Sequence, residues 1–458
     1  MSIKSSMQIA ASRNLSRLVA ALGGAHSAIP HLNRPRACNA SSTQCRQQSS
    51  VAFGKVCRRP QAQPHRWHTI PPSRQFRLNQ RRHFVAKVTD YLPAYADYTD
   101  SQLTVREAIA KICSNFPDSY WLNIDNTATW PTDFQQAIAK AGWLGIMMPS
   151  QYGGAELGLA EATIMMQTIA ESGGGYTASS CVHMNIFGLA PVVKYGSEEQ
   201  KARFLPPLIE GRERACFAVT EPNTGLDTLK LQSLATRDGD EYVLKGSKIW
   251  TSTAQVAEKI LILVRTTPLE KVKKPSEGLT LFYTDLDRSQ VSVEEIKKMG
   301  RAAVDTNSLY FDGWRVPATD RIGNEGDGFK MIMHGMNAER ILIAGEAIGL
   351  GIAAVRHAAR YARERVVFGR PIGQNQGIAH PLAKAWCELE STRLMTMQAA
   401  KMWDEGFATG EYANACKYLA GEHAFTACET AVCSMGGMGY AKESVPTKNI
   451  MLSDFCVK

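Results

Sequence analysis

The sequence predicts an α+β protein in which helices and strands occupy separate stretches of the chain. Apolar residues recur every three to four positions from about residue 100 to 213, about every second position from 215 to 325, and again with helical spacing from 328 onward. Helices, then strands, then helices are typical of an α+β layout with segregated elements. The expected domains are an N-terminal helical domain over 89–213, a middle β domain over 214–326 built as a small β-barrel or sandwich, and a C-terminal helical domain over 327–458.

Four amphipathic stretches predict the helices of the first domain. In each, apolar residues lie three or four positions apart, and Gly-rich turns separate the stretches. They read "TVREAIAKICSNF", "TDFQQAIAKAGWLG", "GLAEATIMMQTIAES" and "SEEQKARFLPPLIEG".

The middle domain is predicted from β-branched and aromatic residues at a period near two. An Asp-Gly turn opens "DGDEYVLKGSKIWTS", which supports a strand directly after it. Further strands are predicted at "KILILV", "GLTLFYTDL", "QVSVEEI" and "NSLYFDGWRV".

Two long helices are predicted in the last domain, from "FKMIMHGMNAERILIAGEAIGLGIAAVRHAARYARERV" and "QGIAHPLAKAWCELESTRLMTMQAAKMW". Gly345, Gly349 and Gly351 interrupt the first of these stretches. Either they bend the helix, or they mark places where another element packs close to its backbone.

The N-terminus differs in charge from the rest of the chain. Fifteen of the 52 Lys and Arg residues lie in 1–87, where no Asp or Glu occurs, so the remainder holds 37 basic and 43 acidic residues. The net charge of +9 therefore does not indicate a nucleic-acid surface. An Arg-rich, Ser-rich, acid-free segment is typical of a mitochondrial transit peptide, which we expect over 1–88, with "RRHF" at 81–84 near its end. The alternatives are a disordered basic arm or a misjudged translation start.

Several other classes of protein lose support. No apolar run approaches the roughly 18–20 residues that cross a bilayer, so we expect no membrane span. The eleven Cys include no CxxC pair, and the five His after residue 84 are far apart, so neither a disulfide framework nor a metal site is expected. No HExxH, GxSxG, Walker A or GxGxxG motif occurs.

One loop has the form needed to bind a flat heterocycle. "CFAVTEPNTGLDT" at 216–228 begins as a strand and breaks at Pro222, Asn223 and Gly225. Such a loop exposes backbone N–H and C=O groups together with hydroxyls. Taken alone, the stretch favours an ordinary surface turn that closes a strand.

Several motifs together favour a specific family. "GSKIWTS" at 246–252, "ARERVVFGRPIGQNQGIAHPLA" at 362–383 and "GGMGYAKE" at 436–443 accompany the loop, as do "PSQYGG" and "GSEEQKARFLPPLIEG". In order and spacing they resemble the acyl-CoA dehydrogenase family from about residue 100 to the end. The resemblance implies an FAD-dependent enzyme that converts an acyl-CoA to the trans-2-enoyl-CoA and passes electrons to electron-transfer flavoprotein in the mitochondrial matrix. It also implies a homo-oligomer, a dimer or tetramer.

The resemblance assigns cofactor roles to twelve positions. The loop would hold the isoalloxazine ring of FAD, Trp250 would cover the ring, and Ser252 would reach the flavin N5 atom. Arg365, Phe368 and Gln376 would serve the FAD of a neighbouring subunit, with the guanidinium on the pyrophosphate. The full set of expected cofactor-binding residues is Phe217, Val219, Thr220, Gly225, Trp250, Thr251, Ser252, Arg365, Phe368, Gln376, Gly436 and Gly437.

The catalytic base is expected at Glu339. Oxidation of a saturated thioester requires a base for the α proton, and burial beside an acyl chain raises the pKa of a Glu and makes it a better base. The family takes its base either from an "EGT"-like stretch near the C-terminus, which this chain lacks, or from a Glu on the long helix, which "NAER" matches. Arg340 and Leu226 fall at substrate-binding positions, Leu226 in place of a Ser, and Glu346 is the nearby rival base.

Two alternatives and one departure accompany the resemblance. The same scaffold serves acyl-CoA oxidases, which use O₂ as acceptor, and it would also serve a catalytically silent binding or assembly paralogue. The chain ends at "SDFCVK", where relatives continue with a further helix, so we expect a truncated C-terminal bundle. The alternatives are a faulty gene model and a shortened protein, and in a shortened protein we expect reduced FAD affinity.

Overall fold

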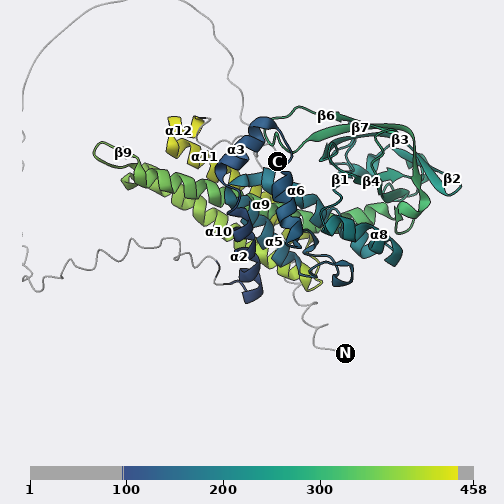
Figure 1. Ribbon diagram of the computed structural model, residues 1–458, viewed down its shortest axis with the longest axis horizontal. Helices are drawn as coiled ribbons and strands as arrows, with labels where there is room; N and C mark the ends of the chain where they lie inside the picture. The colour runs from purple at the N-terminus through teal and green to yellow at the C-terminus, as the bar shows by residue number, and fades with distance from the viewer. Residues whose placement is uncertain (1–94, 96, 442–458) are drawn as a thin grey trace, which may run out of the picture. The chain divides into compact units, whose positions relative to one another are not determined.

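The computed structural model describes residues 95 and 97–441 (Figure 1). The expected transit peptide over 1–88 and the C-terminal stretch 442–458 lie outside the described residues. Within the described part, two helical segments flank one β sheet, so the predicted fold class is confirmed.

The first helical segment follows the predicted periodicities. Ser197 accepts a hydrogen bond from the Gln200 backbone N–H at the start of α8, and the Gln200 side chain accepts one from the Ser197 backbone, which satisfies two N–H groups of the first turn. Thr99 and Gln102 form the same capping box before α2. The helices are α2 (Asp100–Cys113), α3 (Asp118–Thr127), α4 (Thr132–Lys140), α5 (Leu159–Ile169), α6 (Gly175–Phe187), α7 (Ala190–Tyr195) and α8 (Glu198–Ile209).

The middle segment forms one eight-stranded sheet. Its strands are β1 (Ala215–Ala218), β2 (Leu234–Asp238), β3 (Glu241–Ser252), β4 (Lys259–Arg265), β5 (Leu279–Asp285), β6 (Val291–Glu295), β7 (Thr306–Pro317) and β8 (Arg321–Ile322). The order is β6-β7-β3-β2-β4-β5-β8, with β1 parallel to β4. The expected barrel is wrong, because in the described residues β6 pairs only with β7 and β8 only with β5, so the sheet stays open.

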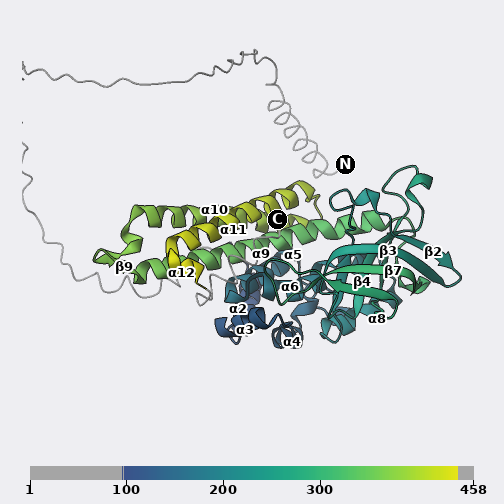
Figure 2. The same ribbon diagram turned by 90° about the horizontal axis from the view of Figure 1, so that it is seen from above.

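The last segment consists of long helices that lie alongside one another (Figure 2). They are α9 (Gly328–Glu364), α10 (Gln376–Asp404) and α11 (Gly410–Met435), with a short α12 (Gly437–Tyr440). A hairpin of β9 (Val366–Val367) and β10 (Arg370–Pro371) joins α9 to α10.

The glycines of α9 allow close packing. A Cβ added at Gly345 would lie 2.8 Å from the Thr163 side chain, and one at Gly349 would lie 2.3 Å from the Gln167 carbonyl, both on α5. At Gly351 the same atom would meet Leu389 of α10 at 2.7 Å. The helix is unbroken over 37 residues, so close approach, rather than bending, explains these glycines.

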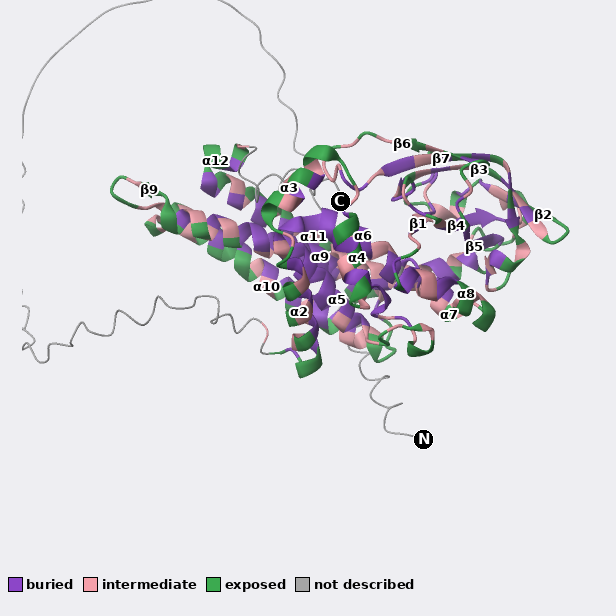
Figure 3. Cartoon of the chain, viewed as in Figure 1, coloured by how far each residue is buried: buried purple, intermediate pink, exposed green. Residues whose placement is uncertain are grey.

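Helix α9 is also the described helix that is long and apolar enough to cross a membrane by length and composition. An 18-residue window of this helix meets that criterion, and the expectation that the chain has no membrane span stays a prediction. Of that window, 78% is buried inside the protein, as in the core helix of a folded domain (Figure 3).

The buried residues form three clusters. The largest joins α2, α5 and α6 to α9, α10 and α11, and so unites the two helical segments. A second packs α8 against one face of the sheet and the start of α9, and a third fills the other face. Because α6, the sheet and α9 each belong to this packing, their facing side chains are held in place where the three meet.

Candidate active site

One cavity of about 190 Å³ lies where α6, the sheet and α9 meet. Four residues expected in the site line it: Phe217 from β1, Trp250 and Ser252 from β3, and Glu339 from α9. These residues lie up to 122 positions apart in sequence, so only the packing of the three segments brings them together.

Two helices present regularly spaced side chains to the cavity. Glu339, Ile343 and Glu346 are spaced four and three residues apart on α9, which places them on one helix face. Tyr176, Ser180 and His183 repeat the same spacing on α6 and line the same cavity. The cavity therefore runs along about two turns of each helix.

Glu339 lies at this wall with a raised pKa. The main cause is burial, which disfavours the charged carboxylate; Glu346 also raises the pKa, while His183 and Arg340 lower it. No side chain in the described part of the chain hydrogen-bonds this carboxylate. A carboxyl group in such surroundings is suited to take up a proton.

Glu346 and His183 form a pair farther along the same cavity. His183 Nδ1 lies 2.5 Å from Glu346 Oε1, and the Glu346 side chain is only 3% exposed. Burial lowers the pKa of His183, but the carboxylate of Glu346 more than offsets this, so the pKa is raised. The rival base considered from sequence is thus held by an imidazole, whereas Glu339 is not.

The end of β3 has an unusual backbone. The β3–β7 register shifts between Lys248 and Thr251, and within this bulge Trp250 has a φ of +62°. Thr253 follows with a φ of +72°, a rare conformation for a β-branched residue. The bulge leaves the Trp250 side chain 58% exposed at the cavity. Backbone strain of this kind is concentrated at binding and catalytic sites.

The same segment carries three hydroxyl groups, of which those of Ser252 and Thr253 line the cavity. The Oγ1 atoms of Thr251 and Thr253 are buried and have no hydrogen-bond partner in the structure, which costs about 1–3 kcal/mol each if nothing binds them. Ser252 has one long contact, 3.5 Å to the Thr306 hydroxyl. An exposed indole beside three hydroxyls fits a flat, polar heterocycle such as a flavin ring.

The buried Lys248 of β3 holds the loop after β1 in place through hydrogen bonds. Lys248 Nζ donates to the Val219 carbonyl at 3.1 Å and to Glu221 Oε1 at 2.8 Å, and the Thr220 carbonyl accepts from the Ile249 N–H at 2.9 Å. Burial lowers the pKa of Lys248 to about 8, although Glu221 opposes this. These bonds tie Val219 and Thr220 to β3, two residues before Trp250.

Besides Val219, Thr220 and Thr251, three further predicted residues of this region lie apart from the cavity wall. Gly225 and Leu226 are fully exposed in the loop, and a Cβ at Gly225 would meet nothing within 4 Å. Arg340 donates to Asn337 Oδ1 at 3.0 Å, one turn back on α9. Their expected roles in binding substrate or cofactor stay predictions.

A second cavity, of about 490 Å³, lies where α9 and α11 end. It gathers Arg365, Gly436 and Gly437 from the predicted cofactor set. Gly436 caps α11 with a φ of +57°, so it also ends that helix. Phe368, at the tip of the hairpin, and Gln376, the first residue of α10, are exposed in the single chain.

Sequence reasoning missed His183, Arg301 and Thr253, which also line the first cavity. No local pattern distinguishes His183 from a core histidine of α6, and it meets Glu346 across 163 positions of sequence. For Thr253 the sequence did contain a signal of a binding site: in "WTST" at 250–253, three hydroxyl residues directly follow an indole at the end of a predicted strand. The described residues contain no group of three or more His, Cys, Asp or Glu that could hold a metal ion.

Comparison with family models gives a consistent match along the chain. The model of the acyl-CoA dehydrogenase N-terminal domain matches residues 99–212, that of the middle domain 216–314, and that of the C-terminal domain 326–453.

Individual proteins agree with the family models. Acyl-CoA dehydrogenase FadE12 of Mycobacterium tuberculosis H37Rv is 32% identical over 350 residues, 75% of this chain and 88% of the relative. Mitochondrial isovaleryl-CoA dehydrogenase of Pongo abelii is 30% identical over 380 residues, 82% of this chain and 88% of that one. The structure of butyryl-CoA dehydrogenase from Megasphaera elsdenii matches with a TM-score of 0.72 and 26% identity, over 77% of this chain and 93% of the other.

Proposed function

This chain belongs to the acyl-CoA dehydrogenase family of FAD-dependent oxidoreductases, and on that premise we propose that it converts an acyl-CoA to the trans-2-enoyl-CoA with Glu339 as base. The observation that carries the proposal is the cavity that Glu339 shares with Trp250 and Ser252. A proton acceptor and a site for a flat ring therefore face the same space.

Glu339 would remove the α proton of the thioester. Its raised pKa makes the carboxylate a stronger base than an exposed Glu, because proton-transfer catalysis improves as the pKa of the base approaches the working pH. Surrounding apolar side chains, such as Ile343 and Met184, exclude water from the reacting carbons.

FAD, when bound, supplies the acceptor for the hydride that leaves the β carbon. On this chain Trp250 would cover the ring, and the hydroxyls of Ser252 and Thr253, which line the cavity, would donate to its polar atoms. Lys248 would hold the strand and loop in register beneath the ring.

The second cavity supports a homo-oligomer, a dimer or tetramer. Arg365, Phe368 and Gln376 are exposed in one chain, and Arg365 shares a cavity with Gly436 and Gly437. An exposed guanidinium beside two glycines suits the pyrophosphate of a neighbouring subunit's FAD. Sedimentation of the FAD-loaded protein tests this: a monomer that retains full FAD would remove the basis for shared sites.

Two further parts of the proposal concern the location of the protein in the cell and its electron acceptor. The acid-free, Arg-rich residues 1–88 support import into the mitochondrial matrix, where electron-transfer flavoprotein would accept the electrons. Expression with a fluorescent C-terminal fusion, with and without residues 1–88, tests the location. Import that is unaffected by the deletion would count against the presequence.

The central experiment is a spectroscopic titration of the purified, FAD-supplemented protein with acyl-CoAs under anaerobic conditions. Bleaching of the flavin absorbance is expected, followed by recovery when electron-transfer flavoprotein is added. Rapid recovery in air with peroxide release would instead indicate an oxidase. A protein that binds neither FAD nor acyl-CoA would indicate a silent paralogue.

A further inference from the structure

The proposed reaction leaves the pair formed by Glu346 and His183 in the cavity unused. Glu346 and His183 line the same space as Glu339, with Ile343 between them on α9. Seven residues separate the two carboxylates in sequence, which corresponds to roughly 10 Å along the helix axis. The pair therefore faces the part of an acyl group distant from the thioester, if the α carbon lies beside Glu339.

The surroundings of Glu346 leave its carboxylate short of donors. A buried carboxylate is costly unless several hydrogen bonds replace its water, and it offers about four acceptor positions. Among the described residues, His183 alone donates to Glu346. By contrast, the equally buried Glu171 accepts hydrogen bonds from Tyr95, Arg106 and Gln167.

The position of Glu346 makes a ligand the natural source of a second donor. Its carboxylate is nearly closed off from bulk water but borders the cavity. A ligand group in the cavity can therefore reach the carboxylate, whereas bulk water has little access to it. The imidazole of His183 fixes the carboxylate in place, which reduces the entropy lost when a ligand binds. Ionised carboxylates accept hydrogen bonds and do not donate them, so the complementary ligand group is a donor.

We propose that the substrate is an acyl-CoA whose acyl group carries a hydroxyl in its distal part, and that Glu346, positioned by His183, accepts the hydrogen bond from that hydroxyl. The proposal rests on the proposed function, because the base at Glu339 sets which end of the acyl group lies near Glu346. An alkyl chain in the same place would remove water from the Glu346 carboxylate without offering it a hydrogen bond, and this desolvation would weaken binding. Ile343 and Met184 would contact the alkyl carbons between the two ends.

The test compares three acyl-CoAs of equal chain length that end in a methyl, a keto or a hydroxyl group. For the FAD-loaded protein we expect kcat/KM for the hydroxyl compound to exceed that for the methyl compound about tenfold or more. The keto compound should resemble the methyl compound, because a keto group cannot donate. Equal values for all three, or a preference for the methyl compound, would overturn the proposal.

Two substitutions localise the effect. Glu346→Gln keeps the shape of the side chain but replaces the charged acceptor of the substrate hydroxyl by a neutral amide oxygen. The ratio of kcat/KM for the hydroxyl compound to that for the methyl compound should therefore fall about fivefold. Glu346→Leu should reverse the preference. The exposed carboxylate of Glu411 on α11 provides the matched control, and Glu411→Gln should leave the ratio unchanged. A ratio that survives in both Glu346 variants would assign the selectivity to other residues and contradict the proposal.

Binding separates this inference from the proposed function. Calorimetry with FAD-loaded Glu339→Gln protein gives the Kd of each acyl-CoA without turnover. Tighter binding of the hydroxyl compound without bleaching in the wild type would support the inference and contradict the proposed reaction. Bleaching by all three compounds with equal Kd values would support the reaction and contradict the inference.

Discussion

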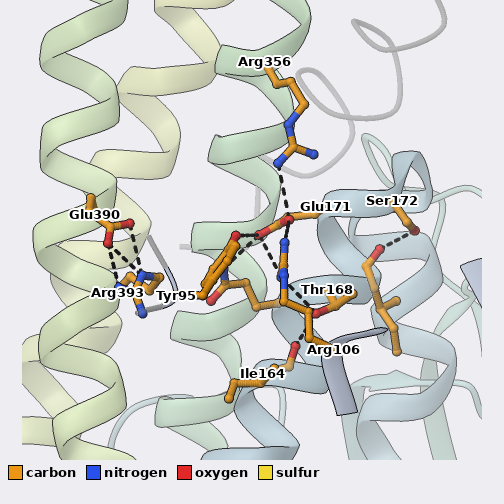
Figure 4. Close-up of polar contacts among 11 residues, drawn as sticks. Tyr95, Arg106, Ile164, Thr168, Glu171, Ser172, Arg356, Glu390 and Arg393 are labelled. Atoms are coloured by element: carbon orange, nitrogen blue, oxygen red, sulfur yellow. Dashed lines mark hydrogen bonds and ion pairs between the residues drawn. The ribbon is translucent and has the colours of Figure 1, made fainter. Parts of the chain in front are cut away.

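Two glutamates of this protein, Glu171 and Glu339, illustrate how surroundings decide the chemistry of one residue type. Glu171, after α5, accepts hydrogen bonds from Tyr95, Arg106 and Gln167 and also pairs with Arg356 at 3.5 Å (Figure 4). Burial alone would raise its pKa, but the two arginines and the hydrogen bonds lower it. Glu339 has no hydrogen-bond donor among the described residues, and its pKa is raised.

The difference separates a structural carboxylate from a reactive one. Glu171 is an ion held in place by cations from α2 and α9, so it links helices of the first and last segments. Glu339 faces a cavity in which a proton donor can be placed. Because a charge that is fully paired has little affinity for another proton, only the unpaired carboxylate is available as a base.

The largest effect is expected from Glu339→Gln. Removal of a general base costs about 10²–10⁴-fold in rate, while the amide has the same shape and leaves the flavin site intact. The rate of anaerobic bleaching by acyl-CoA measures the loss, and the yellow absorbance measures retained FAD. Bleaching at the wild-type rate would place the base elsewhere.

The matched change at the other carboxylate, Glu171→Gln, should affect stability rather than rate. It leaves the cations of Arg106 and Arg356 without their counter-charge, and loss of one partner of a buried pair costs about 3 kcal/mol or more. The thermal midpoint of the protein should fall, with bleaching kinetics close to wild type at low temperature.

The stability cost of Glu171→Gln should depend on pH. The folded-state pKa of Glu171 lies below its unfolded value of about 4.3, so its stabilisation is complete above that value and is lost as the pH falls. Midpoints of wild type and variant should therefore converge in acid. A difference that stays constant from pH 7 to pH 3 would contradict the role of its charge.

A smaller effect is expected from His183→Gln on the pH profile. His183 lowers the pKa of Glu339, and Glu346 and Arg340 act with opposite signs on the same group. Replacement of the imidazole by a neutral amide removes this lowering effect, so the pKa of Glu339 should rise further. Because the base works when deprotonated, the acidic limb of kcat/KM should move to higher pH. As a control, Arg340→Lys keeps the positive charge at this position and should leave the acidic limb of kcat/KM where it is. A shift of the limb to lower pH in His183→Gln would refute the proposed effect of His183 on the pKa of Glu339.

The smallest effect is expected from Ser252→Ala. If Ser252 donates one hydrogen bond to the cofactor, its loss costs about 1 kcal/mol, or about fivefold in the Kd for FAD. Fluorescence titration of apoprotein with FAD measures this. Ser308→Ala on β7, outside the cavity, serves as the control. An unchanged Kd in Ser252→Ala would remove this residue from the cofactor set.

The sequence by itself determined the elements and most of their order. Periodicities of 3.6 and two are local properties, so they located α9, α10 and the strands, and the Ser197 cap marked the start of α8. The resemblance to a family placed Glu339, Trp250 and Ser252 in one site, and the structure brings these three residues to one cavity. The roles given to them remain predictions.

Only the tertiary structure decided whether the sheet closes and which titratable side chains come into contact. Whether β6 and β8 pair depends on the path of the whole sheet, which no strand pattern encodes, so the strand patterns could not decide between the expected barrel and sandwich, and the sheet is not closed. The contact between His183 and Glu346 joins residues 163 positions apart, and the strained φ of Trp250 arises from a register shift against β7. Local sequence sets which residues can be helical or extended, but the surroundings of a carboxylate, and hence its pKa, come from segments that pack against it from elsewhere in the chain.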